Sequence, residues 1–467
     1  MTPFIYSDEM KNDTICAIAT GATNAGISII RISGDDAFTV ADKIFVAKKP
    51  GKKLSERKTH TLTYGNIIYD NKVIDEVLVS VMRGPNSYTA ENIAEINCHG
   101  GYAVTKKVLE CCIRSGARLA EPGEFTKRAF LNGRIDLSQA EAVIDLISAS
   151  NDDAIKNSVA QLIGRLKEKI ISIREKIITD TAYIEAALDD PEHIDLSGFK
   201  DKLFEHVRSR EAEISSLISG FENGKIIQNG IRTVILGKPN AGKSTLLNAL
   251  TGTHRAIVTD IPGTTRDILE DRIVVDGITL NIVDTAGIHD TDDVVEKMGV
   301  ERAVEEIKSA DLCLFLADAS RDLDDDDRNI ISLLKDKNAI VLLNKSDLSP
   351  VLTQDELKKA TGRDVISISA KDETGIDVFI SEIKRMFDLG NLDKKEDIYI
   401  TKLRHKELLD KADLSLKEVI RSIENDMPED FFTIDLMDAY TSLGKIIGEE
   451  IEDDLADKIF KEFCMGK

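Results

Sequence analysis

The chain has 467 residues, of which 42% are hydrophobic, so it is long enough for two or three domains that each bury a core. Asp and Glu outnumber Lys and Arg by 83 to 61, and the formal net charge of −22 excludes a nucleic-acid clamp that covers the whole protein. Any contact with RNA must therefore be local or supplied by a partner. The first residues lack the apolar stretch of a signal peptide, and no apolar run is long enough to cross a membrane, so we expect a cytoplasmic protein.

The cysteines predict reduced thiols rather than a metal site or a disulfide framework. No two of them form a C-x-x-C pair, and Cys98-His99 is too isolated to predict zinc. Cys464 is either a reactive thiol or a small buried side chain. The six positions are Cys16, Cys98, Cys111, Cys112, Cys313 and Cys464.

The amino-terminal 120 residues predict a compact α+β unit. Short β-branched runs are typical of strands, and we expect strands at 14–20, 27–32, 59–69, 73–82 and 91–97. Asp70-Asn71, between the third and the fourth of these, predicts a hairpin turn. We expect a helix over 102–114, which ends near Gly116.

Residues 138–221 have a helical pattern almost throughout. One apolar set steps by threes and fours, as residues on one helix face do, and comprises Ile155, Val159, Leu162, Leu166, Ile170, Ile173 and Ile177. We interpret this stripe as packing within the chain, with a coiled coil between chains as the alternative. Asp189-Asp190-Pro191 breaks the helical run, and beyond residue 392 the pattern is helical again.

Residues 231–387, between the two helical segments, alternate strand and helix as a doubly wound parallel α/β domain does. Within them, residues 237–244 read G-K-P-N-A-G-K-S, a P-loop pattern between a predicted strand and a helix that begins at Thr245. Backbone N–H groups of such a loop and of the helix start bind phosphates. Lys243 can reach the β- and γ-phosphates, and Ser244 can ligate Mg²⁺.

Three further nucleotide motifs follow the P-loop in order. D-T-A-G at 284–287 can hold Mg²⁺ through water and contact the γ-phosphate. N-K-S-D at 344–347 favours GTP over ATP, because its aspartate can accept the two N–H groups that guanine offers and adenine lacks. S-A-K at 369–371 can donate a backbone N–H to the guanine oxygen. The predicted GTP contacts are Asn240, Ala241, Gly242, Lys243, Ser244, Thr245, Thr259, Asp260, Ile261, Pro262, Gly263, Thr264, Thr265, Asp284, Thr285, Ala286, Gly287, Asn344, Lys345, Ser346, Asp347, Ser369, Ala370 and Lys371.

The segment 259–267 predicts a switch loop, in which Thr265 or Thr264 binds Mg²⁺ in the GTP state and releases it after hydrolysis. Ile288 follows D-T-A-G where Ras-like enzymes carry a water-orienting glutamine, so hydrolysis needs another route. Asn240 and oxygens from 259–264 can surround a K⁺ ion, which would neutralise charge that develops in the transition state. The acidic run at 324–327 predicts a solvated helix start, with a metal site as the alternative.

Motifs outside the nucleotide domain resemble those of the MnmE (TrmE) family of tRNA-modifying GTPases. They are D-T-I at 13–15, R-I-S-G at 31–34, G-P-N-S-Y-T at 84–89, H-G-G at 99–101, E-P-G-E-F at 121–125 and F-C-M-G-K at 463–467. The resemblance runs from about residue 12 to residue 467. It implies a folate-binding-type α+β domain at 1–133, an all-α domain at 134–229 and 389–467, and an inserted Ras-like doubly wound G domain at 230–388.

The resemblance also implies a mechanism. Members are K⁺-activated GTPases that form homodimers and close their G domains on each other during hydrolysis. They act with the FAD-dependent partner GidA (MnmG) on C5 of the tRNA wobble uridine, and a reduced folate (5-formyl- or 5,10-methylenetetrahydrofolate) supplies one carbon. The implied ligands are Asn240, Thr259, Ile261 and Thr264 for K⁺, Ser244 and Thr265 for Mg²⁺, and Arg31, Glu95, Arg134 and Lys467 for folate. Glu296 would orient the attacking water, and Lys243 and Thr265 complete the implied catalytic set.

Two other functions remain open from the sequence. One is a ribosome-assembly GTPase of the Era or EngA type, which would need a basic KH-like domain after the G domain. The residues there are helical in pattern and rich in Asp and Glu instead. The other is a folate-dependent aminomethyltransferase with a regulatory GTPase insert, which would act without tRNA or GidA.

Overall fold

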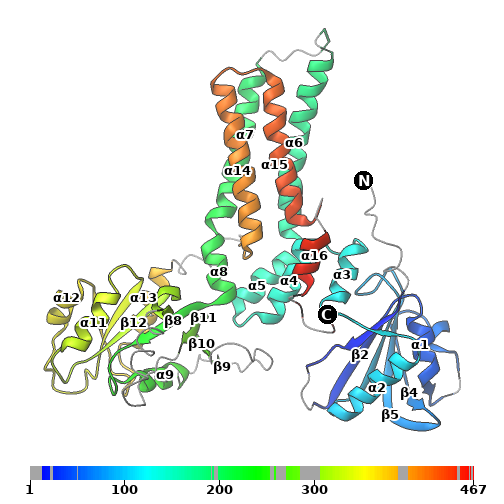
Figure 1. Ribbon diagram of the computed structural model, residues 1–467, viewed down its shortest axis with the longest axis horizontal. Coiled ribbons are helices and arrows are strands. Elements are labelled where there is room, and N and C mark those ends of the chain that lie inside the picture. Colours follow the sequence, from blue (N-terminus) through cyan, green and yellow to red (C-terminus); the bar gives the residue numbers. More distant parts are fainter. Residues whose placement is uncertain are drawn as a thin grey trace. The chain divides into compact units, whose positions relative to one another are not determined.

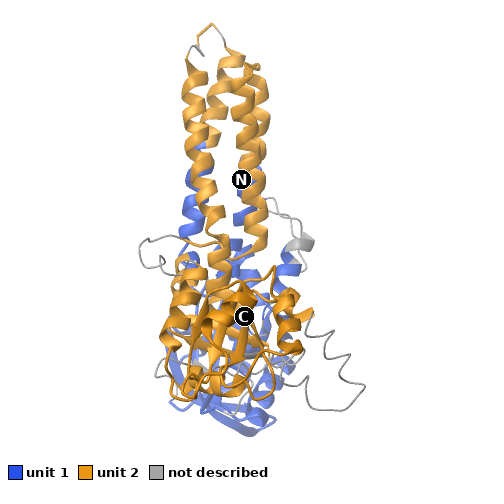
Figure 2. Ribbon diagram, turned by 90° about the vertical axis from the view of Figure 1, so that its left-hand side faces the viewer, with its two compact units in different colours: residues 1–144, 161–176, 440–467 blue, residues 145–160, 177–439 orange. Residues whose placement is uncertain are grey.

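The computed structural model describes residues 13–21, 25–49, 51–190, 192–193, 198–252, 257–258, 270–283, 305–387, 398–449, 453–461, 463 and 466. Tertiary contacts divide the chain into two compact units, coloured separately in Figure 2. Unit 1 comprises Met1–Ile144, Gln161–Lys176 and Tyr440–Lys467, and unit 2 comprises Asp145–Ala160 and Ile177–Ala439. None of the helices in the described ranges is long and apolar enough to cross a lipid bilayer.

Unit 1 contains a mostly antiparallel sheet in the order β3-β4-β5-β6-β2-β1-β7, with β7 parallel to β1 (Figure 1). Its strands are β1 (Ile15–Ile18), β2 (Ile27–Ser33), β3 (Phe45–Ala47), β4 (Thr61–Tyr69), β5 (Lys72–Met82), β6 (Ile93–His99) and β7 (Arg118–Leu119). The predicted strands and hairpin are confirmed. Asp70 and Asn71 have φ of 51° and 60°, the left-handed conformation that a tight hairpin turn requires.

One face of this sheet forms a core against α1 (Ala37–Ile44) and α2 (Tyr102–Arg114), which confirms the predicted helix. Strand alternation sends Ile30 and Ile32 into that core and leaves Arg31 for the other face. The five described cysteines are free and buried, and burial raises the pKa of the Cys16 thiol to about 12, so the thiol form is favoured. Cys464 lies outside the described residues.

Helices also form across both predicted helical segments, and α3 (Glu124–Leu131) forms in addition, before the first of them, where no helix was predicted. The other helices are α4 (Leu137–Ser148), α5 (Asp152–Leu162), α6 (Arg165–Asp189), α7 (Phe199–Ser219), α8 (Phe221–Asn229), α14 (Leu403–Glu424), α15 (Glu429–Ile447) and α16 (Asp453–Lys461). Within unit 2, α7 and α14 pack along each other (Figure 1). The helical run ends at Asp189, before Pro191, as predicted.

The prediction that the apolar residues between 155 and 177 share one helix face is wrong. The chain breaks between α5 and α6 at Gly164, whose φ of 94° no continuous helix contains. On α6, Leu166, Ile170, Ile173 and Ile177 are fully buried, which confirms packing within the chain for that half, whereas Ile155 and Val159 on α5 are 43% and 39% exposed. A four-residue spacing happens to continue across the break, so periodicity alone could not detect it.

The second sheet lies in unit 2 and has the order β14-β13-β12-β8-β11-β10-β9. The strands are β8 (Ile231–Leu236), β9 (Ile257–Val258), β10 (Glu270–Val275), β11 (Ile278–Val283), β12 (Leu312–Asp318), β13 (Ala339–Asn344) and β14 (Val365–Ser367), and the helices are α9 (Lys243–Gly252), α11 (Asp325–Leu333), α12 (Gln354–Thr361) and α13 (Ile376–Met386). Strands β14, β13, β12, β8 and β11 run parallel, with a separate apolar core on each face. The predicted doubly wound domain, inserted between helices, is confirmed.

The acidic run at 324–327 is a helix start. Asp324 caps α11, because its carboxylate accepts the backbone N–H groups of Asp326 and Asp327. The predicted solvation is wrong for one member, since Asp327 is fully buried and paired with Arg321 at 2.9 Å.

Candidate functional site

The P-loop follows the carboxyl end of β8, in the middle of the parallel strands, and α9 begins at Lys243. Two of its glycines leave no room for a side chain. A Cβ at Gly237 would lie 2.5 Å from the Leu316 carbonyl oxygen, and one at Gly242 would lie 2.2 Å from Asn344 Nδ2. Both glycines have positive φ, 149° and 100°. The loop therefore has the close-packed backbone that a phosphate cradle requires.

The Lys243 ammonium lies across this loop, where its Nζ donates to the Gly237 carbonyl at 2.6 Å. A bound phosphate would offer it charged oxygens in place of a neutral carbonyl, which strengthens the hydrogen bond. Ser244 and Thr245 are exposed in the first turn of α9. Their hydroxyls are therefore accessible to a metal ion and to phosphate oxygens at a helix N-terminus.

One buried side chain connects three of the predicted motifs. Asn344 is 2% exposed, and its Nδ2 donates to the Ala241 carbonyl of the P-loop at 2.8 Å. Its Oδ1 accepts the backbone N–H of Ala370 at 3.0 Å. The P-loop, N-K-S-D and S-A-K are thus held together before any nucleotide binds, which is the preorganisation that a nucleotide site needs.

Asp347, the predicted guanine contact, is held in place by its own hydrogen bond and by one from the neighbouring Ser346. Ser369 Oγ donates to Asp347 Oδ1 at 2.8 Å, and the Ser346 N–H donates to the Ile368 carbonyl at 3.1 Å. Asp347 itself is exposed, so its remaining carboxylate positions are accessible to a base. A carboxylate fixed in this way can accept two N–H groups from one guanine edge.

Two ion pairs beside the motifs were missed from the sequence. Lys345, with φ of 64°, donates to Asp318 Oδ2 at 2.6 Å at the carboxyl end of β12. Burial would raise the pKa of Asp318, but hydrogen bonds from Lys345 and Ser320 outweigh it and hold that pKa below its ordinary value. Lys238 of the P-loop pairs with Asp324 at the start of α11. The available signal was the position of Asp318, a charged residue at the end of an otherwise apolar strand.

The remaining predicted nucleotide and metal contacts lie outside the described residues. They are Thr259, Asp260, Ile261, Pro262, Gly263, Thr264, Thr265, Asp284, Thr285, Ala286, Gly287 and Glu296. The residue before D-T-A-G, Val283, ends β11 next to β8, at the same edge of the sheet as the P-loop. Asn240, with φ of 63°, is the one predicted K⁺ ligand among the described residues.

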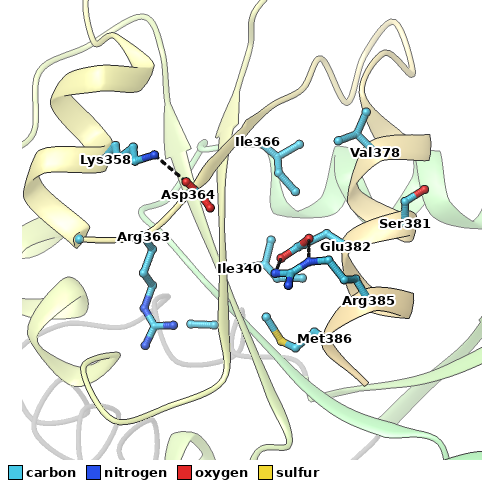
Figure 3. Close-up of a pocket in the computed structure, with 12 residues that line it drawn as sticks. Ile340, Lys358, Arg363, Asp364, Ile366, Val378, Ser381, Glu382, Arg385 and Met386 are labelled. Atoms are coloured by element: carbon cyan, nitrogen blue, oxygen red, sulfur yellow. Dashed lines mark hydrogen bonds and ion pairs between the residues drawn. The ribbon is translucent and has the colours of Figure 1, made fainter. Parts of the chain in front are cut away.

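A pocket of about 640 Å³ in the same domain lies at the other end of the sheet (Figure 3). It is lined by the start of β13, by residues before and in β14, and by α13. N-K-S-D follows the opposite end of β13. The charged residues of the pocket pair with each other, Lys358 with Asp364 and Arg385 with Glu382, both at 2.6 Å. Ligands of open parallel sheets bind at the carboxyl ends of the strands, so this pocket is separate from the nucleotide site.

A second candidate site lies in unit 1, on the sheet face opposite the core. Arg31 on β2 and Glu95 on β6 face each other across the strands and form an ion pair of 2.8 Å. The Arg31 guanidinium lies 5.1 Å from the centre of the Tyr88 ring and 5.6 Å from that of Phe125. Arg134 lies over the same Tyr88 ring at 4.8 Å. Three of the four residues predicted for folate are therefore brought together around one aromatic ring.

The chain end also reaches this site. The Gly466 carbonyl accepts from Arg31 Nη1 at 3.5 Å. A Cβ at Gly466 would lie 2.1 Å from the Ile18 carbonyl, so the chain passes directly against the sheet. Lys467, the fourth predicted residue, lies outside the described residues. The sequence did not single out Tyr88 and Phe125, although both belong to the motifs G-P-N-S-Y-T and E-P-G-E-F.

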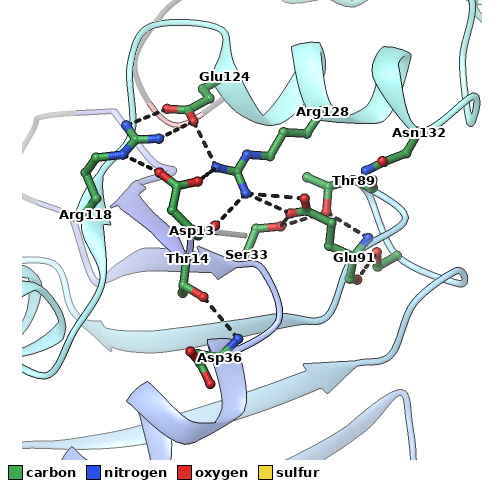
Figure 4. Close-up of polar contacts among 11 residues, drawn as sticks. Asp13, Thr14, Ser33, Asp36, Thr89, Glu91, Arg118, Glu124, Arg128 and Asn132 are labelled. Carbon is green, nitrogen blue, oxygen red and sulfur yellow. Dashed lines mark hydrogen bonds and ion pairs between the residues drawn. The ribbon is translucent and has the colours of Figure 1, made fainter. Parts of the chain in front are cut away.

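A partly buried ion-pair network holds the elements that carry these rings (Figure 4). Arg128 on α3 donates to Asp13, to Glu124 at 3.0 Å and to Glu91 at 3.3 Å. Arg118 bridges Asp13 and Glu124, each at 2.6 Å. Burial alone would raise the pKa of Glu124, but the hydrogen bond from Arg118 and the other contacts outweigh this effect. The pKa of Glu124 is therefore below its ordinary value, and the carboxylate stays charged. The network fixes the start of α3, which contains Phe125.

The comparisons with known proteins agree along the chain. Residues 137–464 match the family described as "MnmE helical domain", and residues 14–134 match "GTP-binding protein TrmE N-terminus". The tRNA modification GTPase MnmE of Lachnoclostridium phytofermentans is 58% identical over 458 residues, which cover 98% of this chain and 100% of that protein. The protein of the same name from Acetivibrio thermocellus is 47% identical over 98% of this chain and 100% of its own length. Among solved structures, a variant of Aquifex aeolicus Era bound to GDP and AlF4− is 29% identical, covers 40% of this chain and 66% of that chain, and has a TM-score of 0.27.

Proposed function

The chain belongs to the MnmE family of tRNA modification GTPases, and on that premise we propose how its two candidate sites divide the work. The protein is a GTP hydrolase that acts in tRNA modification. The observation that carries the nucleotide half is Asn344, which joins the P-loop to both guanine motifs. The Era-type alternative would need a KH-like domain after the G domain, but the described residues there form only α14, α15 and α16.

Hydrolysis is K⁺-activated in this proposal. Asn240, Thr259, Ile261 and Thr264 would hold K⁺, Ser244 and Thr265 would hold Mg²⁺, and Glu296 would orient the water when two G domains close on each other. The support is Ile288, which takes the place of the usual catalytic glutamine, and the left-handed backbone of Asn240 inside the P-loop. The test compares GTP turnover in KCl and NaCl, with Asn240→Ala as the variant. A K⁺ preference that the variant loses supports the site, and equal turnover in both salts would refute it.

The unit 1 site binds a reduced folate in this proposal. The Glu95 carboxylate, held by Arg31, would accept N–H groups of the pterin edge, and Tyr88 would stack on a ring. Arg134 would bind a glutamyl carboxylate, and Lys467 is the fourth predicted ligand. When bound, the folate supplies the one-carbon unit for C5 of the wobble uridine, in a reaction shared with GidA. Calorimetric titration with 5-formyltetrahydrofolate tests this. We expect Arg134→Ala to weaken binding at least about tenfold, since it removes a charge-assisted contact; equal affinity in both proteins would reject the site.

A homodimer fits an apolar patch on the outer face of the unit 1 sheet. Leu62 and Tyr64 on β4 and Leu78 on β5 are 65%, 50% and 43% exposed, and Tyr64 lies opposite Leu78 in the strand register. Such a patch at the centre of an interface is typical of stable dimers. Light scattering at several concentrations of wild type and Leu62→Asp tests it, because a charge in the patch should dissociate the dimer. A variant that stays dimeric at low concentration would exclude this face.

Nucleotide-driven motion reaches the helices through β11 in this proposal. Thr279 is the second residue of β11, and its Oγ1 accepts from Asn151 Nδ2 at 2.9 Å, directly before α5. Asn151 Nδ2 also donates to the Ile227 carbonyl on α8 at 3.0 Å, and its Oδ1 accepts the Ala154 N–H at 2.7 Å. The other end of β11 leads into D-T-A-G. Thr279→Val should leave GTP hydrolysis within about twofold but lower tRNA modification severalfold, while Thr279→Ser retains both; undiminished modification in the valine variant would contradict this route.

We retain the domain boundaries 1–133, 134–229, 230–388 and 389–467 as part of the proposal. The alternative of an aminomethyltransferase that acts without tRNA is left without support by the family to which the chain belongs.

A further inference from the structure

The segment 48–58 concentrates positive charge in an otherwise acidic protein. Its eleven residues include six Lys or Arg and a single Glu, whereas Asp and Glu outnumber Lys and Arg by 83 to 61 in the whole chain. Net charge and its distribution decide where a polyanion can approach. The segment is therefore the place where a local RNA contact has to be sought.

This basic loop joins β3 to β4 at the edge of the unit 1 sheet. It begins where the Lys48 N–H donates to the Tyr64 carbonyl at 3.2 Å. Lys48 itself pairs with Glu76 at 2.8 Å and is already neutralised. Four further lysines on the loop are exposed and have no carboxylate partner within the described part of the chain: Lys49, Lys52, Lys53 and Lys58.

Two side chains from elsewhere hold the second half of the loop, residues 54–57, in place. Both carboxylate oxygens of Asp42, on α1, accept from the loop, from the Leu54 N–H at 2.7 Å and from the Ser55 hydroxyl at 2.6 Å. The Arg83 guanidinium, after β5, donates to the Ser55 carbonyl and to the Arg57 carbonyl at 3.0 Å. A lysine-bearing loop fixed in this way loses little backbone entropy when it binds, unlike a free basic tail.

The guanidinium of Arg57 has no acceptor for its Nε in the part of the chain that the structure describes, and that nitrogen is buried. The Arg57 Nη2 lies close to Gly51 in the same loop, because a Cβ built on Gly51 would be 3.7 Å from it. A buried donor without an acceptor is costly, and a planar guanidinium is suited to two phosphate oxygens at once. The loop therefore carries a half-buried guanidinium that has no acceptor for its Nε among the described residues, on the same segment as four exposed lysines.

We propose that this basic loop binds the sugar–phosphate backbone of the tRNA substrate. The inference rests on the proposed function, since it assigns the surface that receives the tRNA named there. Contacts of lysine and arginine to phosphates position a nucleic acid without reading its sequence. The acidic remainder of the protein repels the same backbone, so the loop fixes which face of the protein the tRNA approaches.

The test measures binding of an unmodified tRNA transcript to the full-length protein by fluorescence anisotropy over a range of KCl concentrations. The loop variant carries Lys49→Gln, Lys52→Gln, Lys53→Gln and Lys58→Gln. The control variant makes the same change in net charge at exposed lysines of unit 2 and carries Lys202→Gln, Lys335→Gln, Lys359→Gln and Lys411→Gln. Equal thermal unfolding midpoints establish that all three proteins are folded.

We expect the loop variant to bind at least about tenfold more weakly at roughly 0.1 M salt, and the control to bind as wild type does. Each lost phosphate contact removes about 0.7–0.9 from the slope of log K against log[salt], so the slope should fall by about three in the loop variant. Equal affinities for the two variants would overturn the proposal and leave the tRNA-modification function standing. Loop-dependent binding to phosphatidylserine vesicles, with tRNA binding unchanged, would assign the surface to a membrane instead. Failure of the proposed function would appear separately, as wild-type protein that supports no tRNA modification with its partner.

Discussion

Replacement of Gly242 by alanine tests the nucleotide site most directly. The new Cβ would lie 2.2 Å from Asn344 Nδ2, closer than any normal contact, at a backbone φ of 100°. Either the P-loop or the Asn344 amide must move. Movement of the amide breaks its hydrogen bonds to Ala241 and Ala370, both of which are buried.

The expected cost follows from these contacts. A side chain in this region of φ costs about 1–3 kcal/mol. Each buried backbone group left without a partner costs about 1–3 kcal/mol, and Asn344 serves two of them. The total is about 3–9 kcal/mol. If this cost falls on the nucleotide-binding conformation, it weakens GDP binding by about two to six powers of ten.

The assay is titration of a fluorescent GDP analogue, with Gly252→Ala as the matched control. Gly252 ends the same helix, α9, but nothing lies within 4 Å of a Cβ built there. Gly252→Ala should therefore bind as wild type does. If Gly242→Ala binds GDP within about threefold of that control, the close packing of the P-loop against Asn344 has no functional weight and the argument fails.

Three further outcomes are expected. Ser369→Ala removes the hydrogen bond that fixes Asp347, so GDP should bind about three- to tenfold more weakly, and an unchanged titration would show that Asp347 needs no such support. Arg128→Met leaves three carboxylates without their shared partner and should destabilise the protein by about 3–5 kcal/mol in thermal unfolding, whereas a loss below about 1 kcal/mol would contradict it. The pKa values of Asp13 and Glu124 are lowered in the folded state, so their ionised forms stabilise the folded protein. This stabilisation is complete above the ordinary carboxyl pKa of about 4, and it is lost as the pH falls through the lowered values. Unfolding followed between pH 7 and pH 2 should show that loss for wild type and a smaller loss for Arg128→Met, in which Arg118 still pairs with Asp13 and Glu124.

Local sequence patterns predicted the elements of this protein well. Apolar alternation and turn residues predicted the hairpin of β4 and β5, and the P-loop pattern predicted its strand and helix. The pattern failed at Gly164, where Leu162 and Leu166 keep helical spacing across a break in the helix. Spacing records which residues are apolar, but only backbone conformation decides whether they share one helix.

The composition of the two sites was predictable only in part. Motifs indicated Asn344 as a nucleotide residue, but its contact with Ala241 joins positions 103 residues apart. Arg31 donates to the Gly466 carbonyl, although the two residues are 435 positions apart in the sequence. Such pairs depend on how sheets and helices pack, and no local pattern encodes them. Tyr88 and Phe125 were missed for this reason, since their role depends on the guanidinium between them.

The distribution of charge explains how an acidic protein can act on RNA. A net charge of −22 disfavours RNA almost everywhere on the surface, so a basic loop needs only a few cations to be the preferred point of contact. Those cations are useful only if they are not neutralised within the protein. Lys48 pairs with Glu76, whereas the lysines that follow it in the loop have no carboxylate partner among the residues that the structure describes. Asp42 and Arg83 form hydrogen bonds with the backbone of the loop instead, so they hold it without pairing with its lysines. The charge of the chain and the local architecture of the loop therefore favour the same point of contact for the tRNA.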